Sequence, residues 1–214
     1  MDRAIFRCAT ARNNAAPTRR WRSALCWLAV PALLLAGCSK KSEQPSKKAT
    51  LHEVMKDEVD PRGDDVWAVG NKHMTEDAGL NGGSMTDADW KQLAGAATNL
   101  QQAALELAGL PDPIVVVKPG TKIAFEDADW GDSAKSVQHN VDQDPQGVRD
   151  LANALAQHMA DLAAAANKHD AATAGQLIND LDGICESCHV KYWYPSQRGL
   201  INSIKKNSGV DPST

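Results

Sequence analysis

Two cysteines and a histidine lie within five residues near the C-terminal end of the chain, in the stretch ICESCHVKYWYP at residues 184–195. On a helix, Cys185 and Cys188 lie one turn apart, so both sulfurs can form thioethers to the two vinyl groups on one edge of a porphyrin. His189, four residues after Cys185, then presents its imidazole to the iron from the same side. The spacing is the attachment signature of a c-type haem. It predicts one covalently attached haem c with His189 as an iron ligand.

Three other uses of these residues fit the sequence less well. A disulfide between Cys185 and Cys188 would close a loop too short to add much stability. A thioredoxin-like redox pair requires a βαβ context, which this sequence lacks. Zinc requires a fourth ligand and usually a second Cys or His pair at metal-binding spacing, and the sequence shows no such pair.

The N-terminal 37 residues have the composition of an export signal. The first 22 residues carry six arginines and a single acid, and the uncharged run SALCWLAVPALLLAG follows at residues 23–37. This run is too short for a comfortable membrane-spanning helix, and it ends in small residues directly before Cys38. It resembles a bacterial lipoprotein signal. We therefore expect removal of residues 1–37, lipidation of Cys38 and a flexible tether over residues 38–49.

The charge of the mature chain limits its partners. Without the first 37 residues the chain holds 17 Lys and Arg against 26 Asp and Glu, a formal charge of about −9. This acidic balance argues against nucleic acid as a partner. The lipid signal predicts a position on the periplasmic side of a bacterial membrane, and Ser39 in place of an aspartate favours the outer membrane.

From about residue 50 onward, apolar residues recur three and four positions apart, as they do on one face of a helix. Four such segments cover residues 50–71, 86–110, 148–169 and 170–192. Thr86 or Asp87 and Asp170 are expected as N-caps, Gly109 closes the second segment, and Pro61 should kink or split the first. The pattern predicts an all-α chain. Its form is an antiparallel four-helix bundle over residues 50–207 with a basic C-terminal extension, followed by a tail at 208–214.

Alanines are frequent on the inner stripes, which leaves room for a large group inside the bundle. The longer connection between the second and third helices is the least regular part of the sequence. Its β-branched run and Pro-Gly pair predict either a small hairpin at residues 114–125 or an irregular covering loop.

A Cys-x-x-Cys-His motif near the C-terminus, on the fourth helix of an all-helical chain, resembles the class II c-type cytochromes, the cytochrome c′ group. The resemblance covers residues 50–193 and includes Tyr192, three residues after the histidine, and Trp130 before the third helix. Members of this group often carry a basic residue four positions after the haem histidine, whereas this chain has Trp193.

The resemblance implies that the first helix serves the sixth position of the iron. A methionine there gives a low-spin electron carrier, and an apolar residue leaves the iron five-coordinate and open to small gases. Met55 lies near the middle of the first apolar stripe and is the candidate ligand, although a methionine there could also simply pack in the core. His52 is a rival about 60° from the stripe centre at 100° per residue. His73, His139, His158 and His169 are expected to be solvated.

These features favour electron transfer over catalysis. We expect a membrane-anchored periplasmic mono-haem cytochrome that is not an enzyme, because a peroxidase would need a distal acid or base and the first helix offers only His52. A five-coordinate protein that binds nitric oxide or carbon monoxide is the alternative. The expected partners are periplasmic or membrane redox proteins. The basic residues Lys191, Arg198, Lys205 and Lys206 are unopposed by any acid up to Asn207, so they either guide docking to an acidic partner or simply form a solvated basic tail. The resemblance also implies a homodimer through the first two helices.

Overall fold

The computed structural model describes residues 49–75, 79–128 and 131–207. These ranges are mainly helical and contain no β-strand, only an isolated bridge between Met74 and Leu80. The signal sequence, Cys38, almost all of the tether, Trp130 and the tail at 208–214 lie outside them. The helical elements are α1 (Leu51–Val54), a π-helical turn (Met55–Val59), α2 (Asp60–His73), a 3-10 turn (Gly82–Ser84), α3 (Asp87–Ala108), α4 (Ala134–Gln143), α5 (Pro145–Asn167), α6 (Ala171–Cys188), a second π-helical turn (His189–Trp193), a second 3-10 turn (Pro195–Gln197) and α7 (Arg198–Asn207).

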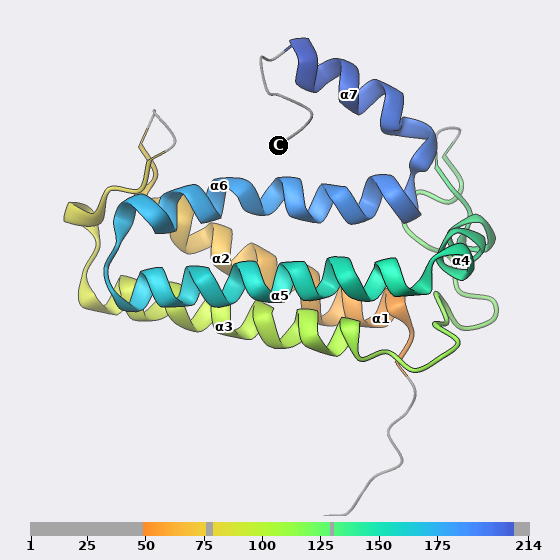
Figure 1. Cartoon of the computed structure of the whole chain (residues 1–214), viewed down its shortest axis with the longest axis horizontal. Helices are drawn as coiled ribbons and strands as arrows, with labels where there is room; N and C mark the ends of the chain where they lie inside the picture. The colour runs from red at the N-terminus through yellow and green to blue at the C-terminus, as the bar shows by residue number, and fades with distance from the viewer. Residues whose placement is uncertain (1–48, 76–78, 129–130, 208–214) are drawn as a thin grey trace, which may run out of the picture. The chain divides into compact units, whose positions relative to one another are not determined.

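Four helical segments lie side by side and alternate in direction: α1 with α2, then α3, α5 and α6 (Figure 1). The prediction of an all-α antiparallel four-helix bundle is therefore confirmed. The predicted caps are confirmed as well, because the Thr86 side chain accepts from the backbone N–H of Asp89, the Asp170 side chain from that of Thr173, and α3 ends at Gly109. In the described part of the chain, no helix has both the length and the apolar character needed to cross a membrane.

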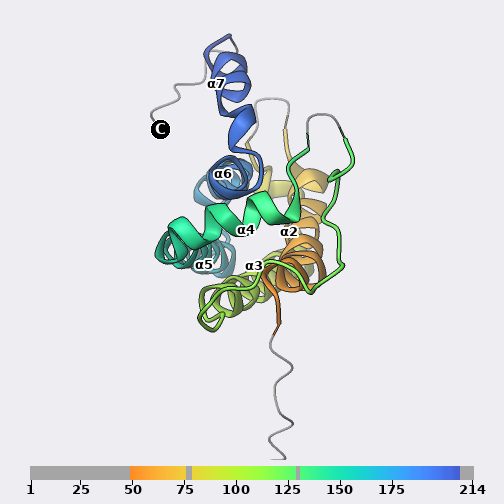
Figure 2. The ribbon, with the colours of Figure 1, turned by 90° about the vertical axis from the view of Figure 1, so that its right-hand side faces the viewer.

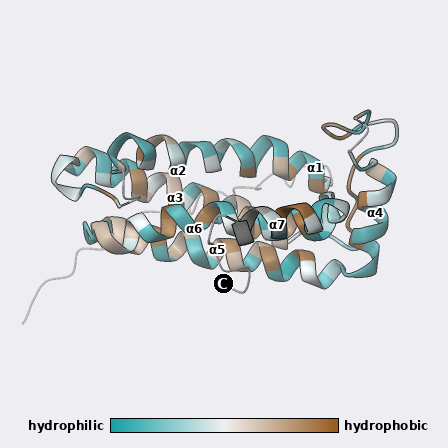
Figure 3. Cartoon of the chain, turned by 90° about the horizontal axis from the view of Figure 1, so that it is seen from above, coloured by the Kyte–Doolittle hydropathy of each residue, from teal (hydrophilic) through white to brown (hydrophobic). Residues whose placement is uncertain are grey.

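The core follows the predicted apolar stripes, with small residues where helices approach closely. α3 and α5 pack along their length and both bury many alanines. In these two helices, the alanines with 0% exposure are Ala97, Ala104 and Ala166. Seen from above, the visible face of α2 is mostly hydrophilic (Figure 3). This separation into an apolar inside and a polar outside is what holds an amphipathic bundle together.

Pro61 changes the first helix without breaking its path. The chain stays in the helical region of backbone space across α1, the π turn and α2, and the N–H of Asp60 donates to the carbonyl of Met55. Proline has no N–H to donate to the carbonyl four residues earlier, and the wider π turn accommodates this loss. The extra residue also shifts the buried face, so Gly63 is buried and Arg62 pairs with Glu58.

The connection between α3 and α5 is an irregular loop followed by α4, which lies across one end of the bundle (Figure 2). Of the two predicted alternatives, the covering loop is therefore present and the hairpin is not. The backbone polar groups of its β-branched run bond to α1 and α4 and do not pair with each other as in a hairpin. Val115 and Val116 accept from the N–H groups of Leu51 and His52 at 2.8 and 3.0 Å, and the Gln138 side chain of α4 bonds Val116 and Ile114.

Candidate haem site

The two cysteines lie in the last turn of α6. Cys185 and Cys188 are free thiols, partly buried, and both pack against the hydrophobic core. Burial raises the pKa of each thiol to about 11, so both are protonated near neutral pH. This position agrees with the helix predicted over residues 170–192, and both sulfurs are free to react.

His189 opens the π turn that continues α6, and neighbouring helices hold this turn in place. The Tyr192 side chain is 2% exposed, and its hydroxyl donates to the carbonyl of Asp144 at 2.9 Å. Asn140 of α4 donates to the carbonyl of Tyr192 at 2.9 Å. Lys191 pairs with the Asp144 carboxylate at 2.7 Å, so it is not the unopposed cation that the sequence predicted. These contacts fix the backbone that carries His189.

A glycine makes this anchor possible. A Cβ on Gly147 of α5 would lie 2.5 Å from the Tyr192 hydroxyl and 2.6 Å from the Lys191 ammonium. Both distances are shorter than a carbon atom allows. The hydrogen at this position therefore permits the side chains after His189 to reach the start of α5.

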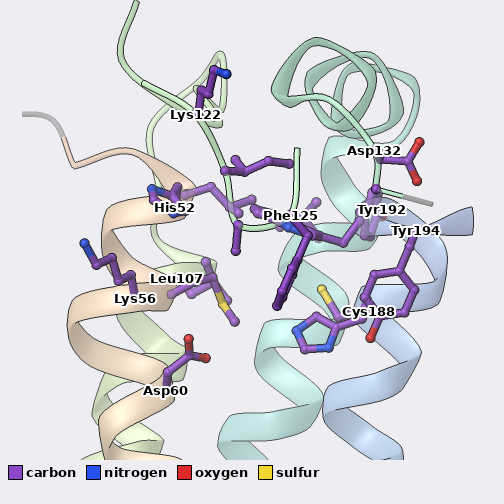
Figure 4. Close-up of a pocket in the computed structure, with 18 of the residues that line it drawn as sticks. His52, Lys56, Asp60, Leu107, Lys122, Phe125, Asp132, Cys188, Tyr192 and Tyr194 are labelled. Carbon is purple, nitrogen blue, oxygen red and sulfur yellow. The ribbon is translucent and has the colours of Figure 1, made fainter. Parts of the chain in front are cut away.

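A cavity of about 820 Å³ lies between α1 with its π turn on one side and the end of α6 on the other (Figure 4). A smaller cavity of about 410 Å³ adjoins it and is lined by Cys185 in addition. The two cavities share the following lining residues: Met55, Asp60, Leu107, Cys188, His189 and Tyr194. Cofactor sites in proteins commonly have volumes of about 300–1,000 Å³, and each of the two cavities falls within this range, so the adjoining cavities offer room for a porphyrin. We call it the haem cavity.

Met55 and His189 each begin a π turn, and both line the haem cavity. Single π turns inside helices are rare and occur frequently at functional sites. The structure thus brings the two predicted axial residues to one space from opposite ends of the folded chain. His52 also lines the larger cavity and is half-buried, as expected for a residue beside the stripe.

The charges differ in balance between the two parts of the haem cavity. The larger cavity is lined by His52, Lys56 and Lys122 and also by two acids, Asp60 and Asp132. The smaller cavity is rimmed by four acids, Asp60, Asp64, Asp182 and Glu186. Burial lowers the pKa of His189, and the nearby carboxylates of Asp60, Asp182 and Glu186 partly oppose this shift. Asp60 is an exposed residue overall, but partial burial of its carboxyl group raises the pKa. Sequence reasoning missed Asp60, which the π turn brings to the cavity.

The donor set fits a covalent haem. Two free thiols one turn apart can form both thioethers, and the imidazole that follows them can bind iron in its neutral form. Cys185 lines only the smaller cavity and Cys188 lines both, so a thioether to Cys185 would form at the smaller cavity. In the larger cavity, His52 and Lys56 lie one turn apart and would be the residues able to pair with the carboxylates of a bound porphyrin. Lys122 on the same rim is bound by Asp127 at 2.6 Å.

Of the four remaining histidines, two make contacts within the fold and two are exposed. His73 is 7% exposed, contacts the Ser84 hydroxyl at 2.9 Å and lies 3.4 Å from an oxygen of Asp89. His158 bonds the carbonyl of Leu177 at 2.7 Å and so connects α5 with α6. The prediction of solvated side chains is wrong for these two and right for His139 and His169, which are exposed. The described ranges contain no group of three or more His, Cys, Asp or Glu side chains that could bind a metal ion.

The fold and the site together define a c-type cytochrome built on a helical bundle. Residues 116–193, from the insert through the haem-binding motif, match the family described as Cytochrome C'. This match supports a class II, cytochrome c′-like family, and the family implies a covalently bound haem c. Comparison with curated proteins gave no significant match, and comparison with solved structures gave none.

Proposed function

We propose that this cytochrome transfers electrons and that Met55 is the sixth ligand of its iron. The observation that carries the proposal is the position of Met55, which lines both cavities together with His189 and is only half-buried. A methionine that served only to fill the core would be enclosed, as Met159 is at 0% exposure. A thioether ligand opposite a histidine is the ligand pair of many electron-transfer cytochromes.

When bound, haem c supplies a one-electron couple between ferric and ferrous iron. The contributions of this chain are to bind, orient and enclose the group. The thiols of Cys185 and Cys188 hold it covalently, and the anchored π turn orients the His189 imidazole. Leu107 and Tyr194 line the inner space and limit the water beside the ligands.

Charge around the site supports a cationic redox partner. The four acids at the smaller cavity lie beside Cys185, at the thioether edge, and partners commonly exchange electrons through an exposed edge of the cofactor. Lys191, which the sequence assigned to a guiding basic extension, is paired with Asp144. Arg198 is exposed but lies beyond the second π turn. A positively charged protein surface would therefore meet complementary charge at the smaller cavity.

We further propose that the protein is anchored through a lipidated Cys38 to the periplasmic side of a bacterial membrane, with the outer membrane favoured by Ser39. The support is the N-terminal sequence, whose arginines, apolar run and small residues precede Cys38. A Cys38→Ser variant should lose its membrane association and be recovered in the soluble periplasmic fraction. Recovery of this variant with the membranes would contradict the anchor. The homodimer stays an expectation from the family resemblance.

The optical spectrum tests the proposed ligand. The reduced protein should show a sharp, intense α band that carbon monoxide does not alter. Met55→Leu keeps the apolar volume but removes the sulfur, so it should give a high-spin spectrum that responds to carbon monoxide. Met74→Leu is the matched control, because Met74 is half-buried at the end of α2 and lines neither cavity. A wild-type spectrum that already responds to carbon monoxide would instead favour the alternative, a five-coordinate gas-binding protein.

A further inference from the structure

The insert between α3 and α4 delivers one aromatic side chain to the haem cavity. Phe125 lines the larger cavity, and its side chain extends between the wall that carries His52 and Lys56 and the wall that carries Cys188 (Figure 4). The residue is 66% exposed, a high value for a phenylalanine. It is also held at a φ of +62°, where bulky residues are seldom found.

Hydrogen bonds and an ion pair within residues 122–128 hold Phe125 in this position. Lys122 and Asp127 form a two-pronged ion pair at 2.6 and 2.9 Å across the turn, and the Glu126 carboxylate accepts from the N–H of Ile123 at 3.1 Å. The carbonyl of Phe125 accepts from the N–H of Ala128 at 2.9 Å. Ile123 is 5% exposed and fixes the segment to the core.

A close backbone approach adds to this constraint. A Cβ on Gly131 would collide with the carbonyl group of Phe125, so the glycine permits the turn that presents the ring. The strained φ and the exposed ring both oppose stability, and neither is required merely to connect two helices. Backbone strain of this kind persists where the surrounding structure enforces it, and it is concentrated at functional sites.

We propose that Phe125 packs against the bound haem at the mouth of the larger cavity and excludes water and small external ligands from the iron. The ring comes from the insert, so it covers the side of the cavity that the four bundle helices leave open. It therefore acts as a specificity-determining residue, which decides how readily molecules other than the protein's own ligands reach the iron. The role depends on the haem site alone and holds whether Met55 is on or off the iron.

Two properties of the holoprotein follow from this covering role. Removal of the ring opens a path from solvent, so external ligands should reach the iron faster. It also lets water approach the haem, and water stabilises the more highly charged ferric state, so the reduction potential should fall.

The test uses the haem-loaded protein in the Met55→Leu background, where the sixth position is open, and measures carbon monoxide association by flash photolysis. We expect Phe125→Ala to accelerate association severalfold and to lower the midpoint potential. Phe125→Trp should retain slow association. Val115→Ala is the matched control, because Val115 is a 45% exposed apolar residue of the same insert that lines neither cavity.

Equal association rates and potentials in Phe125→Ala and Val115→Ala would overturn the proposal. Gly131→Ala provides a second route to the same result, since it displaces the Phe125 backbone and leaves the side chain unchanged, and it should accelerate association as Phe125→Ala does. If the wild-type protein itself binds carbon monoxide, the proposal that Met55 ligates the iron is refuted. The Phe125 variants are then compared in the wild-type background, where the sixth position is already open. The two proposals therefore fail separately.

Discussion

Replacement of Tyr192 by phenylalanine isolates one hydrogen bond of the anchor that holds His189. The change removes the hydroxyl that donates to the Asp144 carbonyl at 2.9 Å but keeps the ring, which is 2% exposed and packs in the core. A buried neutral hydrogen bond contributes about 0.5–1.5 kcal/mol net, so the free energy of unfolding should fall by about 1 kcal/mol. For a chain of this size that loss corresponds to a fall in Tm of about 2–4 °C.

Urea unfolding of the haem-loaded protein measures the effect. The midpoint should move to lower urea while the slope m stays constant, because the change alters stability and not the surface exposed on unfolding. Thr121→Val is the control. It also removes one hydroxyl, but Thr121 is exposed and lines neither cavity. Equal midpoints for the two variants would refute the reasoning, and a loss above about 3 kcal/mol would mean that the hydroxyl supports more than one contact.

Three further predictions concern charge and packing. The hydrogen bond from Lys118 lowers the pKa of Glu53 to about 2. This pair therefore stabilises the fold above the ordinary carboxyl pKa of 4.5, and the contribution is lost as pH falls toward 2. Lys118→Met should make the acid-induced loss of stability shallower in a pH series of urea melts. Gly147→Ala should destabilise by about 1–3 kcal/mol in the same assay, because the steric conflict outweighs the roughly 1 kcal/mol that alanine adds in an ordinary helix. Oxidation of the reduced haem protein by the cation hexaammineruthenium(III) should slow as ionic strength rises. The dependence on ionic strength should be weaker in Asp182→Asn, which removes an acid at the smaller cavity, than in the control Asp161→Asn. Equal dependence in both variants would contradict docking of a cationic partner at the acids of the smaller cavity.

The helices and their caps could be predicted because their signals are local. Thr86, Gly109 and Asp170 act within one turn of their own positions. The haem-binding motif is local in the same sense, since three side chains within five residues define its chemistry. α4 was missed although it has a comparable signal, with Ser133 as N-cap and Val137 and Val141 buried at a spacing of four.

The rest of the site depends on contacts between distant segments. Pro61 predicted a disturbance of the first helix, but a π turn that keeps the chain helical and carries Asp60 to the cavity has no sequence signature known to us. His73 and His158 are buried or bonded by residues of other elements, which periodicity within one helix does not reveal. The direction of Phe125 follows from the packing of the whole insert against the end of the bundle.

The two walls of the haem cavity come from the first and the last elements of the bundle. The attachment motif is complete within α6 and the turn after it, so both thiols and the imidazole are close together in sequence before the chain has folded. The wall with Met55 reaches the motif only when segments more than 100 residues apart meet, which is a contact with a high loop-closure cost. Assembly therefore separates into two stages, a local attachment and a global enclosure. A fragment that lacks residues 51–73 would keep the first stage and lose the second.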